Sequence, residues 1–316
     1  MPLFVNHQGP YWCEIDTGST NLMVPGDLLT CPNCYKPNGI SPNASMGLKF
    51  TVKYGSGRIL HARTYRAEVE PYNSSTPGVH QTFGVIIRAS GNLNSDPILG
   101  MTQQSNPINH YRLTTYMNSL LNAHVINKLR FMIAGCPRLQ STAELVVGGI
   151  DPRLKNTIPV TVPLILNKLD FFITPEALGI AGGHQLGVIN FPVEVDSGTA
   201  DTIIPARLFH PLIRVLNQHL PMPQAFWYGK SFSLSNKQIN QLPAIVLRFA
   251  GNKMLLMKPT AYIIPSASKP GKYVFMISKS YGKHMVLGDA LMSSYAVEFN
   301  HATESMSFYP NRSLCR

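Results

Sequence analysis

The chain carries the same short acidic motif twice, and this repeat constrains its fold more than any other feature. Residues 16–20 read Asp-Thr-Gly-Ser-Thr, and residues 196–200, which begin 180 positions later, read Asp-Ser-Gly-Thr-Ala. Each aspartate follows a short, apolar-leaning run that is typical of a strand. One such motif in each half of a 316-residue chain predicts two similar lobes that each contribute one carboxylate to a shared site.

Paired carboxylates have a specific chemistry. Two carboxylates held about 3 Å apart cannot both ionise at ordinary pH, because each charge disfavours the other. The pair then shares one proton, so that one member acts as general base on a water while the protonated member polarises a carbonyl. This hydrolyses a peptide bond by direct attack of water. Asp16 and Asp196 are therefore the predicted catalytic residues, and they are expected to titrate as one unit.

The residues that follow each aspartate suit this task. Gly18 and Gly198 permit a tight turn and a close approach of the backbone. The hydroxyls of Ser19 and Thr199 are placed to hydrogen-bond a carboxylate and fix its orientation.

Further short segments follow the two aspartates, and one kind recurs at a similar distance in each half of the chain. Residues 54–57 read Tyr-Gly-Ser-Gly and begin 38 positions after Asp16; residues 98–100 read Ile-Leu-Gly and residues 286–288 read Val-Leu-Gly, beginning 82 and 90 positions after their aspartates. With these segments, and with residues 81–84 and 147–151, nearly the whole chain resembles the pepsin-like aspartic proteases, the family of pepsin, cathepsin D and β-secretase. The shared proton described above is that family's own known chemistry.

The resemblance implies an all-β, bilobal fold with a few short helices. Residues 1–152 would form the N-terminal lobe with the first aspartate and a flap, and residues 153–316 the C-terminal lobe with the second. Tyr54, Ser56 and Gly57 would lie on the flap and bind the substrate backbone, and the segments 98–100 and 286–288 would pack behind the two acidic loops. The implied activity is that of an aspartic endopeptidase working in acid on an extended peptide or protein substrate, as a monomer with neither metal nor organic cofactor.

The composition agrees with a β-rich fold. Charged residues make up 14% of the chain and hydrophobic residues 44%, and β-rich runs recur at residues 48–52, 145–147 and 273–277. Helical patterns are short, the best being residues 114–121 and 208–219. The proline-dotted stretch 152–163 is the predicted junction between lobes.

The net charge of +11 raises the question of a nucleic-acid partner. The 27 Lys and Arg are scattered, with no run of five or more, so a solvated basic surface is favoured and no nucleic acid is expected. No apolar run reaches the 18 residues that a membrane span needs, and residues 1–11 lack the apolar core of a signal peptide.

Five cysteines are present. The resemblance implies that Cys136 pairs with Cys315, and that Cys31 and Cys34 form a short disulfide in a loop after the first motif. A redox Cys-x-x-Cys site and a zinc site are the rival readings of the second pair, and the structural disulfide is favoured. Cys13 is left over, and we expect a buried thiol there.

Three sequons, at residues 43–45, 73–75 and 311–313, favour a glycoprotein made in the secretory pathway, either secreted or lysosomal/vacuolar. Two departures from the family pattern are visible. Little sequence precedes the first motif, and Met23 stands where many members carry tryptophan. The short start leaves an alternative open, a catalytically inert peptide-binding protein of the same fold.

Overall fold

The computed structural model describes residues 1–26, 47–72, 75–90, 96–102, 107–108, 111–135, 143–165, 169–183 and 185–310. The chain forms two compact units, Met1–Leu129 and Arg130–Arg316. As predicted, strands dominate and the helices are few and short. The lobe boundary placed after residue 152 stays a prediction.

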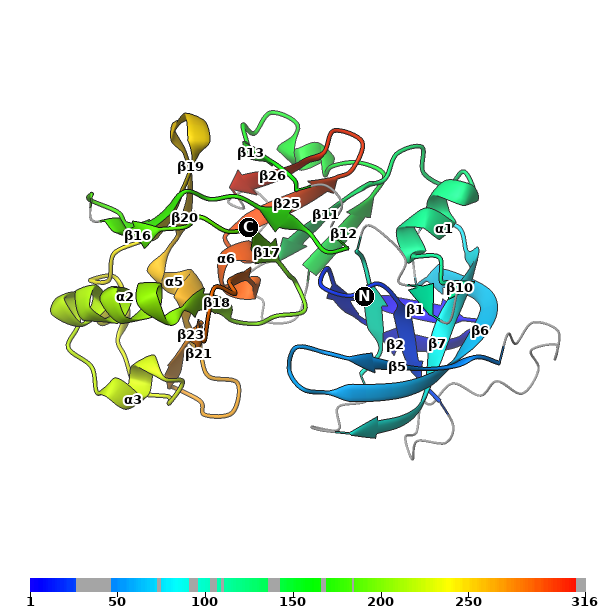
Figure 1. The fold of residues 1–316 in the computed structure, drawn as a ribbon, viewed down its shortest axis with the longest axis horizontal. Helices are drawn as coiled ribbons and strands as arrows, with labels where there is room; N and C mark the ends of the chain where they lie inside the picture. The colour runs from blue at the N-terminus through cyan, green and yellow to red at the C-terminus, as the bar shows by residue number, and fades with distance from the viewer. Residues whose placement is uncertain are drawn as a thin grey trace. The chain divides into compact units, whose positions relative to one another are not determined.

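The first unit is built around one eight-stranded sheet in the order β2-β1-β6-β7-β4-β8-β3, with β5 pairing to β6. Its long strands β6 and β7 form a curved antiparallel ribbon (Figure 1). Buried residues alternate with more exposed ones along β6, as expected for a strand with one face on a core. The elements are β1 Pro2–Val5, β2 Gln8–Trp12, β3 Glu14–Asp16, β4 Leu22–Pro25, β5 Lys49–Lys53, β6 Ile59–Pro71, β7 Val79–Ser90, β8 Ile98–Gly100, β9 Pro107–Ile108, β10 Tyr111–Arg112 and α1 Tyr116–Asn122.

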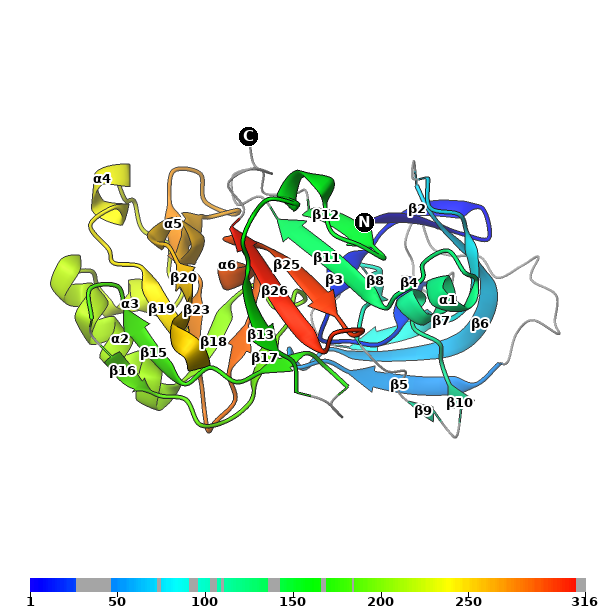
Figure 2. The same ribbon diagram turned by 90° about the horizontal axis from the view of Figure 1, so that it is seen from above.

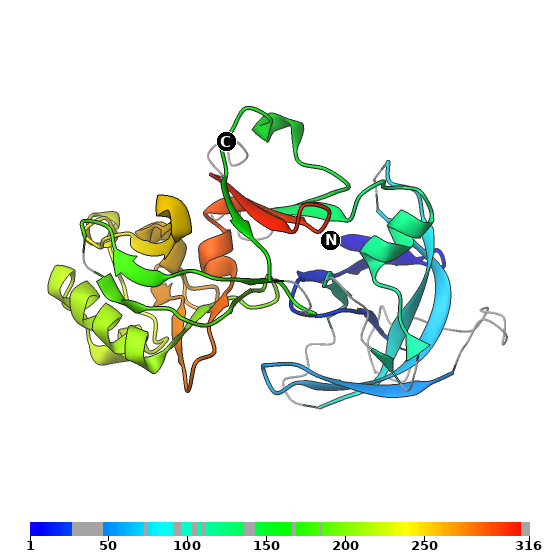
Figure 3. The same ribbon diagram turned by 45° about the horizontal axis from the view of Figure 1, so that its top comes forward.

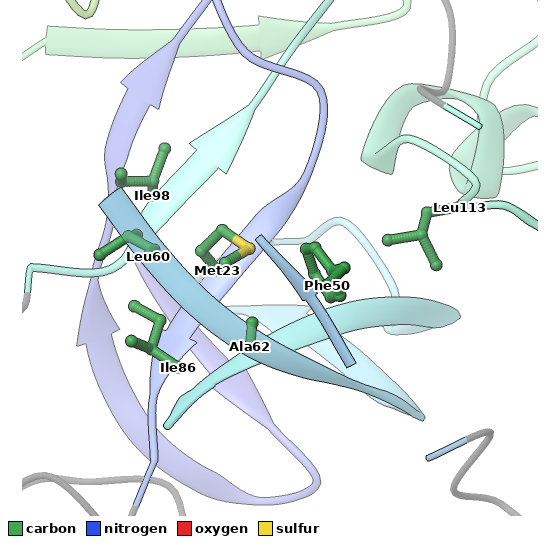
Figure 4. Packing of buried hydrophobic residues seen from close by; sticks show 7 residues of the cluster. All are labelled: Met23, Phe50, Leu60, Ala62, Ile86, Ile98 and Leu113. Carbon is green, nitrogen blue, oxygen red and sulfur yellow. The ribbon is translucent and has the colours of Figure 1, made fainter. Parts of the chain in front are cut away.

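Apolar side chains from several of these strands meet in one buried cluster (Figure 4). Met23, four residues beyond the motif's second hydroxyl, is fully buried there, and Tyr54 packs against the same cluster. The members are Met23, Phe50, Leu60, Ala62, Ile86, Ile98 and Leu113.

The second unit contains several smaller sheets. Those that matter for the site are β14-β17-β24-β18-β23 and β12-β11-β25-β26-β13. The elements are β11 Arg130–Gly135, β12 Ala143–Val147, η2 Pro152–Leu154, β13 Val160–Pro163, β14 Phe172–Ile173, β15 Ala177–Ile180, β16 Gln185–Val188, β17 Val193–Val195, β18 Thr202–Pro205, α2 Ala206–His219, α3 Gln224–Trp227, α4 Asn236–Ile239, β19 Ile245–Phe249, η3 Ala250–Asn252, β20 Lys253–Met257, α5 Pro259–Tyr262, β21 Ile263–Pro265, β22 Tyr273–Phe275, β23 Ile277–Ser280, β24 Val286–Leu287, α6 Asp289–Met292, β25 Tyr295–Asn300 and β26 Ser305–Pro310.

In the second of these sheets, β25 and β26 lie side by side and pair with β11 and β13 (Figure 2). Figure 3 shows the same strand pair in orange and red. Phe131 and Phe299 stack at 4.8 Å, and Phe171, just before β14, meets Phe299 edge-on at 4.6 Å. This aromatic cluster connects the sheet to the segment that leads into β14.

Both predicted helices are confirmed. Helix α1 begins after Thr115, whose side chain accepts the Asn118 N–H and so caps the first turn. Helix α2 spans Ala206–His219 and buries Leu208, Phe209, Leu212 and Leu216, which lie on one face at helical spacing. None of the helices that the structure describes is long and apolar enough to cross a membrane.

Candidate active site

The first acidic motif forms a loop at the end of strand β3. Strand β3 runs parallel to β8, and Asp16 lies opposite Gly100 in the register. The Asp16 Oδ1 accepts the Gly18 N–H at 2.9 Å, and the Asp16 carbonyl accepts the Met101 N–H at 2.8 Å. The Gly18 N–H thereby holds a buried carboxylate, while the Met101 N–H fixes the backbone of the same residue.

The second motif forms a loop of the same design at the end of strand β17. Strand β17 runs parallel to β24, and the Asp196 N–H donates to Leu287 O at 3.1 Å. Asp196 Oδ1 accepts the Gly198 N–H at 2.8 Å, and Oδ2 accepts the Thr199 hydroxyl at 2.6 Å. Hydrogen bonds of this kind fix the orientation of the carboxylate.

Two glycines pack behind the loops, as the sequence predicted. A Cβ added to Gly100 would overlap Asn21 N and lie 2.7 Å from Ser19 O. A Cβ added to Gly288 would overlap the carbonyl oxygens of Thr199 and Asp201. Each position therefore requires glycine because another stretch of backbone passes too close for any side chain.

The second hydroxyl of the motif behaves differently in the two loops. Thr199 bonds its aspartate, whereas Ser19 Oγ is shielded from solvent and hydrogen-bonds none of the residues that the structure describes. The bond predicted from Ser19 to Asp16 is thus not formed in this conformation. A buried, unpaired hydroxyl costs about 1–3 kcal/mol.

The segment predicted as a flap is the tip of a hairpin between β5 and β6. The Tyr54 N–H donates to Arg58 O and the Gly57 N–H to Tyr54 O, each at 2.9 Å, which closes the turn. Gly57 has a φ of 83°, a conformation that favours glycine, and Ser56 is exposed beside it. Burial, and then the nearby Asp16, raise the pKa of Tyr54. The tyrosine is therefore within electrostatic reach of the first aspartate, in the same unit.

One residue near the second loop was missed by the sequence analysis. Burial first, and then the charge of Asp196, raise the pKa of Asp170 to about 6. The only sequence signal is a carboxylate placed directly before Phe171 and Phe172. That signal says nothing about Asp196 until the pairing of β14 with β17 is known.

A second partly buried titratable group contacts Phe171. The ring of His301 meets Phe171 edge-on at 5.6 Å, and His301 Nε2 is a buried atom without a hydrogen-bond partner among the described residues. Burial lowers the pKa of His301 to about 4. This histidine therefore stays neutral over most of the acidic range.

The cysteine predictions fall into two groups. Cys13 is a free, buried thiol, as predicted, and burial raises its pKa to about 12, which makes it a poor nucleophile. The residues of the predicted disulfides and the asparagines of all three sequons lie outside the described residues: Cys31, Cys34, Cys136, Cys315, Asn43, Asn73 and Asn311. Within the described ranges, no group of three or more His, Cys, Asp or Glu side chains is arranged to hold a metal ion.

Comparison with known proteins decides the family. The model of the eukaryotic aspartyl protease family matches residues 9–310, which is nearly the whole chain. This chain belongs to the eukaryotic aspartyl protease family. Both acidic loops, the hairpin and the two packing glycines lie inside the matched range.

Named members are similar along most of the chain, at low identity. Pepsin F of Oryctolagus cuniculus is 25% identical, with 94% of this chain and 76% of that protein covered. Cathepsin D of Dictyostelium discoideum is 24% identical over 93% of this chain and 78% of its own length. The vacuolar aspartic protease of Candida albicans is 24% identical over 90% of this chain and 68% of its own length. Asp16 belongs to the first unit and Asp196 to the second, and their pairing is part of the proposal that follows.

Proposed function

We propose that this protein is an aspartic endopeptidase that hydrolyses peptide bonds with a water activated between Asp16 and Asp196. The observation that carries the proposal is the duplicated loop. In both loops an aspartate lies at the end of a strand or directly after it and accepts the N–H of the glycine two residues later. Behind each loop packs a glycine, Gly100 or Gly288, that admits no side chain. Membership of the aspartyl protease family supports the same activity.

In this mechanism one aspartate is ionised and takes a proton from the attacking water, while the other, protonated, polarises the scissile carbonyl. The N–H groups of Gly18 and Gly198 hold the carboxylates, and Thr199 orients Asp196. An extended peptide would lie under the hairpin, with Tyr54, Ser56 and Gly57 against its backbone. Ser19 would take part only by turning its hydroxyl toward Asp16. No metal or organic cofactor enters these steps.

The shared proton makes acidic pH the expected working range. An aspartate pair that has lost both protons has no acid left to polarise the carbonyl, and repulsion between its charges disfavours that state. Cleavage is therefore expected to fall as the pH rises toward neutrality.

The secretory route and the covalent modifications belong to the same proposal. The name of the Candida albicans relative places that protein in the vacuole, and the three sequons favour glycosylation. A vacuolar, lysosomal or extracellular location would allow the disulfides Cys31–Cys34 and Cys136–Cys315. We expect the protein to act as a monomer on peptide or protein substrates.

Cleavage of an unstructured peptide library between pH 3 and 7 tests the proposal. Wild type, Asp16→Asn and Asp196→Asn are compared, with Asp96→Asn as control because Asp96 is an exposed aspartate of the first unit. Each loop variant should lose about 10³-fold or more in kcat, whereas the control should match wild type. Circular dichroism checks that every variant is folded.

Either of two results would overturn the proposal. Cleavage that survives both loop substitutions would assign the chemistry to other residues. A folded wild type that binds peptides but cleaves none at any pH would favour the inert peptide-binding protein.

A further inference from the structure

The pairing of β14 with β17 brings a third carboxyl to the second acidic loop. The two strands are antiparallel, with Phe172 opposite Glu194 and Ile173 opposite Val193. The Val195 N–H donates to Phe171 O at 2.8 Å, so the same register continues one residue beyond the strand. The next pair in this register is Asp170 and Asp196.

The type of pair decides how close these two side chains lie. Hydrogen-bonded and non-hydrogen-bonded pairs alternate along an antiparallel ladder, and Val195 with Phe171 occupies a hydrogen-bonded position. Asp170 and Asp196 therefore fall at a non-hydrogen-bonded position, where opposite Cβ atoms are about 4.5–5.5 Å apart and share one face. The two carboxyls thus lie one position beyond the last backbone bond of the ladder, close enough to interact electrostatically.

Among the described residues, Asp170 forms no ion pair with a Lys, Arg or His side chain. On the same face, Glu194 lies two residues before Asp196 and opposite Phe172. On the other side of β17, strand β24 offers Val286 opposite Glu194, and the register continues to Gly288, which has no side chain. Among the described residues of β14, β17 and β24, the groups beside Asp170 are therefore carboxylates and apolar side chains.

Like charges directly opposite each other destabilise a strand pair. Partial burial and the charge of Asp196 raise the pKa of Asp170 to about 6. Asp170 is thus a neutral acid at pH 4 to 5, and it becomes a carboxylate as the pH rises through about 6. Each further negative charge beside an aspartate pair makes loss of the shared proton less favourable.

We propose that Asp170 is a positioning residue for Asp196, a third carboxyl that extends the activity of the aspartate pair toward neutral pH. This inference rests on the proposed protease function. In acid, Asp170 adds no charge and leaves the pair unaffected. At higher pH Asp170 is ionised and places a negative charge beside Asp196. This charge disfavours loss of the proton that Asp16 and Asp196 share, so the enzyme stays active at higher pH.

The test is the pH profile of kcat/KM on a cleaved peptide from pH 3.5 to 7.5. Asp170→Asn removes the charge and keeps the shape, so its alkaline limb should move about one pH unit lower, as expected for charges about 5 Å apart with partial screening. At pH 4, kcat/KM should stay within about twofold of wild type, because Asp170 is neutral there. Asp170→Glu should restore most of the wild-type limb.

Glu176→Gln is the matched control, since Glu176 is an exposed carboxylate of the same unit; its profile should overlay that of wild type. Two results would overturn the inference while the protease function stands. The alkaline side of the Asp170→Asn profile could overlay that of wild type, or Asp170→Asn could lose the same fraction of activity at every pH. A wild type inactive at every pH would overturn both. Melting temperatures at pH 4 check that the Asn variant is folded.

Discussion

The two acidic loops use one backbone design with different surroundings. In both, the carboxylate accepts the N–H of the glycine two residues later, and the parallel strand beside it ends at, or leads directly into, a glycine that admits no side chain. Around Asp16 the structure places the hairpin residue Tyr54 and a hydroxyl without a partner. Around Asp196 it places a bonded hydroxyl and the ionisable Asp170. The backbone thus supplies the carboxylate in each unit, and the side chains make the two aspartates unequal.

The shared design is tested most severely at its glycines. Gly288→Ala should destabilise the second unit by about 3 kcal/mol or more, because the new Cβ overlaps two carbonyl oxygens and the backbone must move. Gly100→Ala should cost the first unit about 2 kcal/mol, since the overlap there is with Asn21 N and is less deep. Chemical denaturation measures both effects.

Gly149→Ala is the control for these substitutions, because a Cβ there meets nothing within 4 Å. It should change stability by less than about 0.5 kcal/mol. If Gly288→Ala proved as mild as this control, the backbone contact behind the second loop would not be a tight one, and the parallel between the loops would fail.

The difference between the units should also appear in their acid stability. The pKa of His301 lies near 4, below the ordinary value of 6.5, because the partly buried ring is shielded from water. As the pH falls, the unfolded chain therefore takes up this proton first, and stability is lost between about pH 6.5 and pH 4. His301→Phe should make the second unit about 2 kcal/mol more stable at pH 4 and leave it nearly unchanged at pH 7.

Thermal unfolding at the two pH values measures this effect, with His284→Phe as control because His284 is exposed. Equal effects of His301→Phe at pH 4 and pH 7 would mean that the substitution acts through packing against Phe171 rather than through the proton. Asp170 contributes with the opposite sign. Its folded pKa is raised, so its contribution to stability is present at low pH and is lost as the pH rises through about 6.

The backbone design that the two acidic loops share could be predicted from the sequence. The duplicated motif predicted two loops of one design, and the two apolar-apolar-Gly segments predicted the glycines behind them. The Tyr-Gly-Ser-Gly segment predicted the hairpin, because glycine and serine at a tip between alternating residues are turn formers. Helix 208–219 followed from apolar residues at helical spacing.

The side chains that make the surroundings of the two aspartates unequal could not be predicted in this way. Asp170 reaches Asp196 through the register of the two-residue strand β14, and so short a strand leaves no pattern from which a register can be read. The orientation of the Ser19 and Thr199 hydroxyls depends on side-chain torsions, which the motif does not specify. His301 joins Phe171 across 130 residues of chain, a contact that only the folded sheet creates.

The smallest effect concerns the two hydroxyls. Thr199→Ala removes a 2.6 Å bond to the Asp196 carboxylate and should lower kcat about tenfold, because a hydrogen bond to a charged group contributes about 1.5–3 kcal/mol. Ser19→Ala removes a hydroxyl that bonds nothing among the described residues, so kcat should change less than about twofold and stability should rise slightly. Initial rates at the pH optimum, with a melting curve for each variant, distinguish these outcomes. If Ser19→Ala lowered kcat as much as Thr199→Ala, the serine would turn toward Asp16 during the reaction. The two loops would then be equal in their side chains as well as in their backbone.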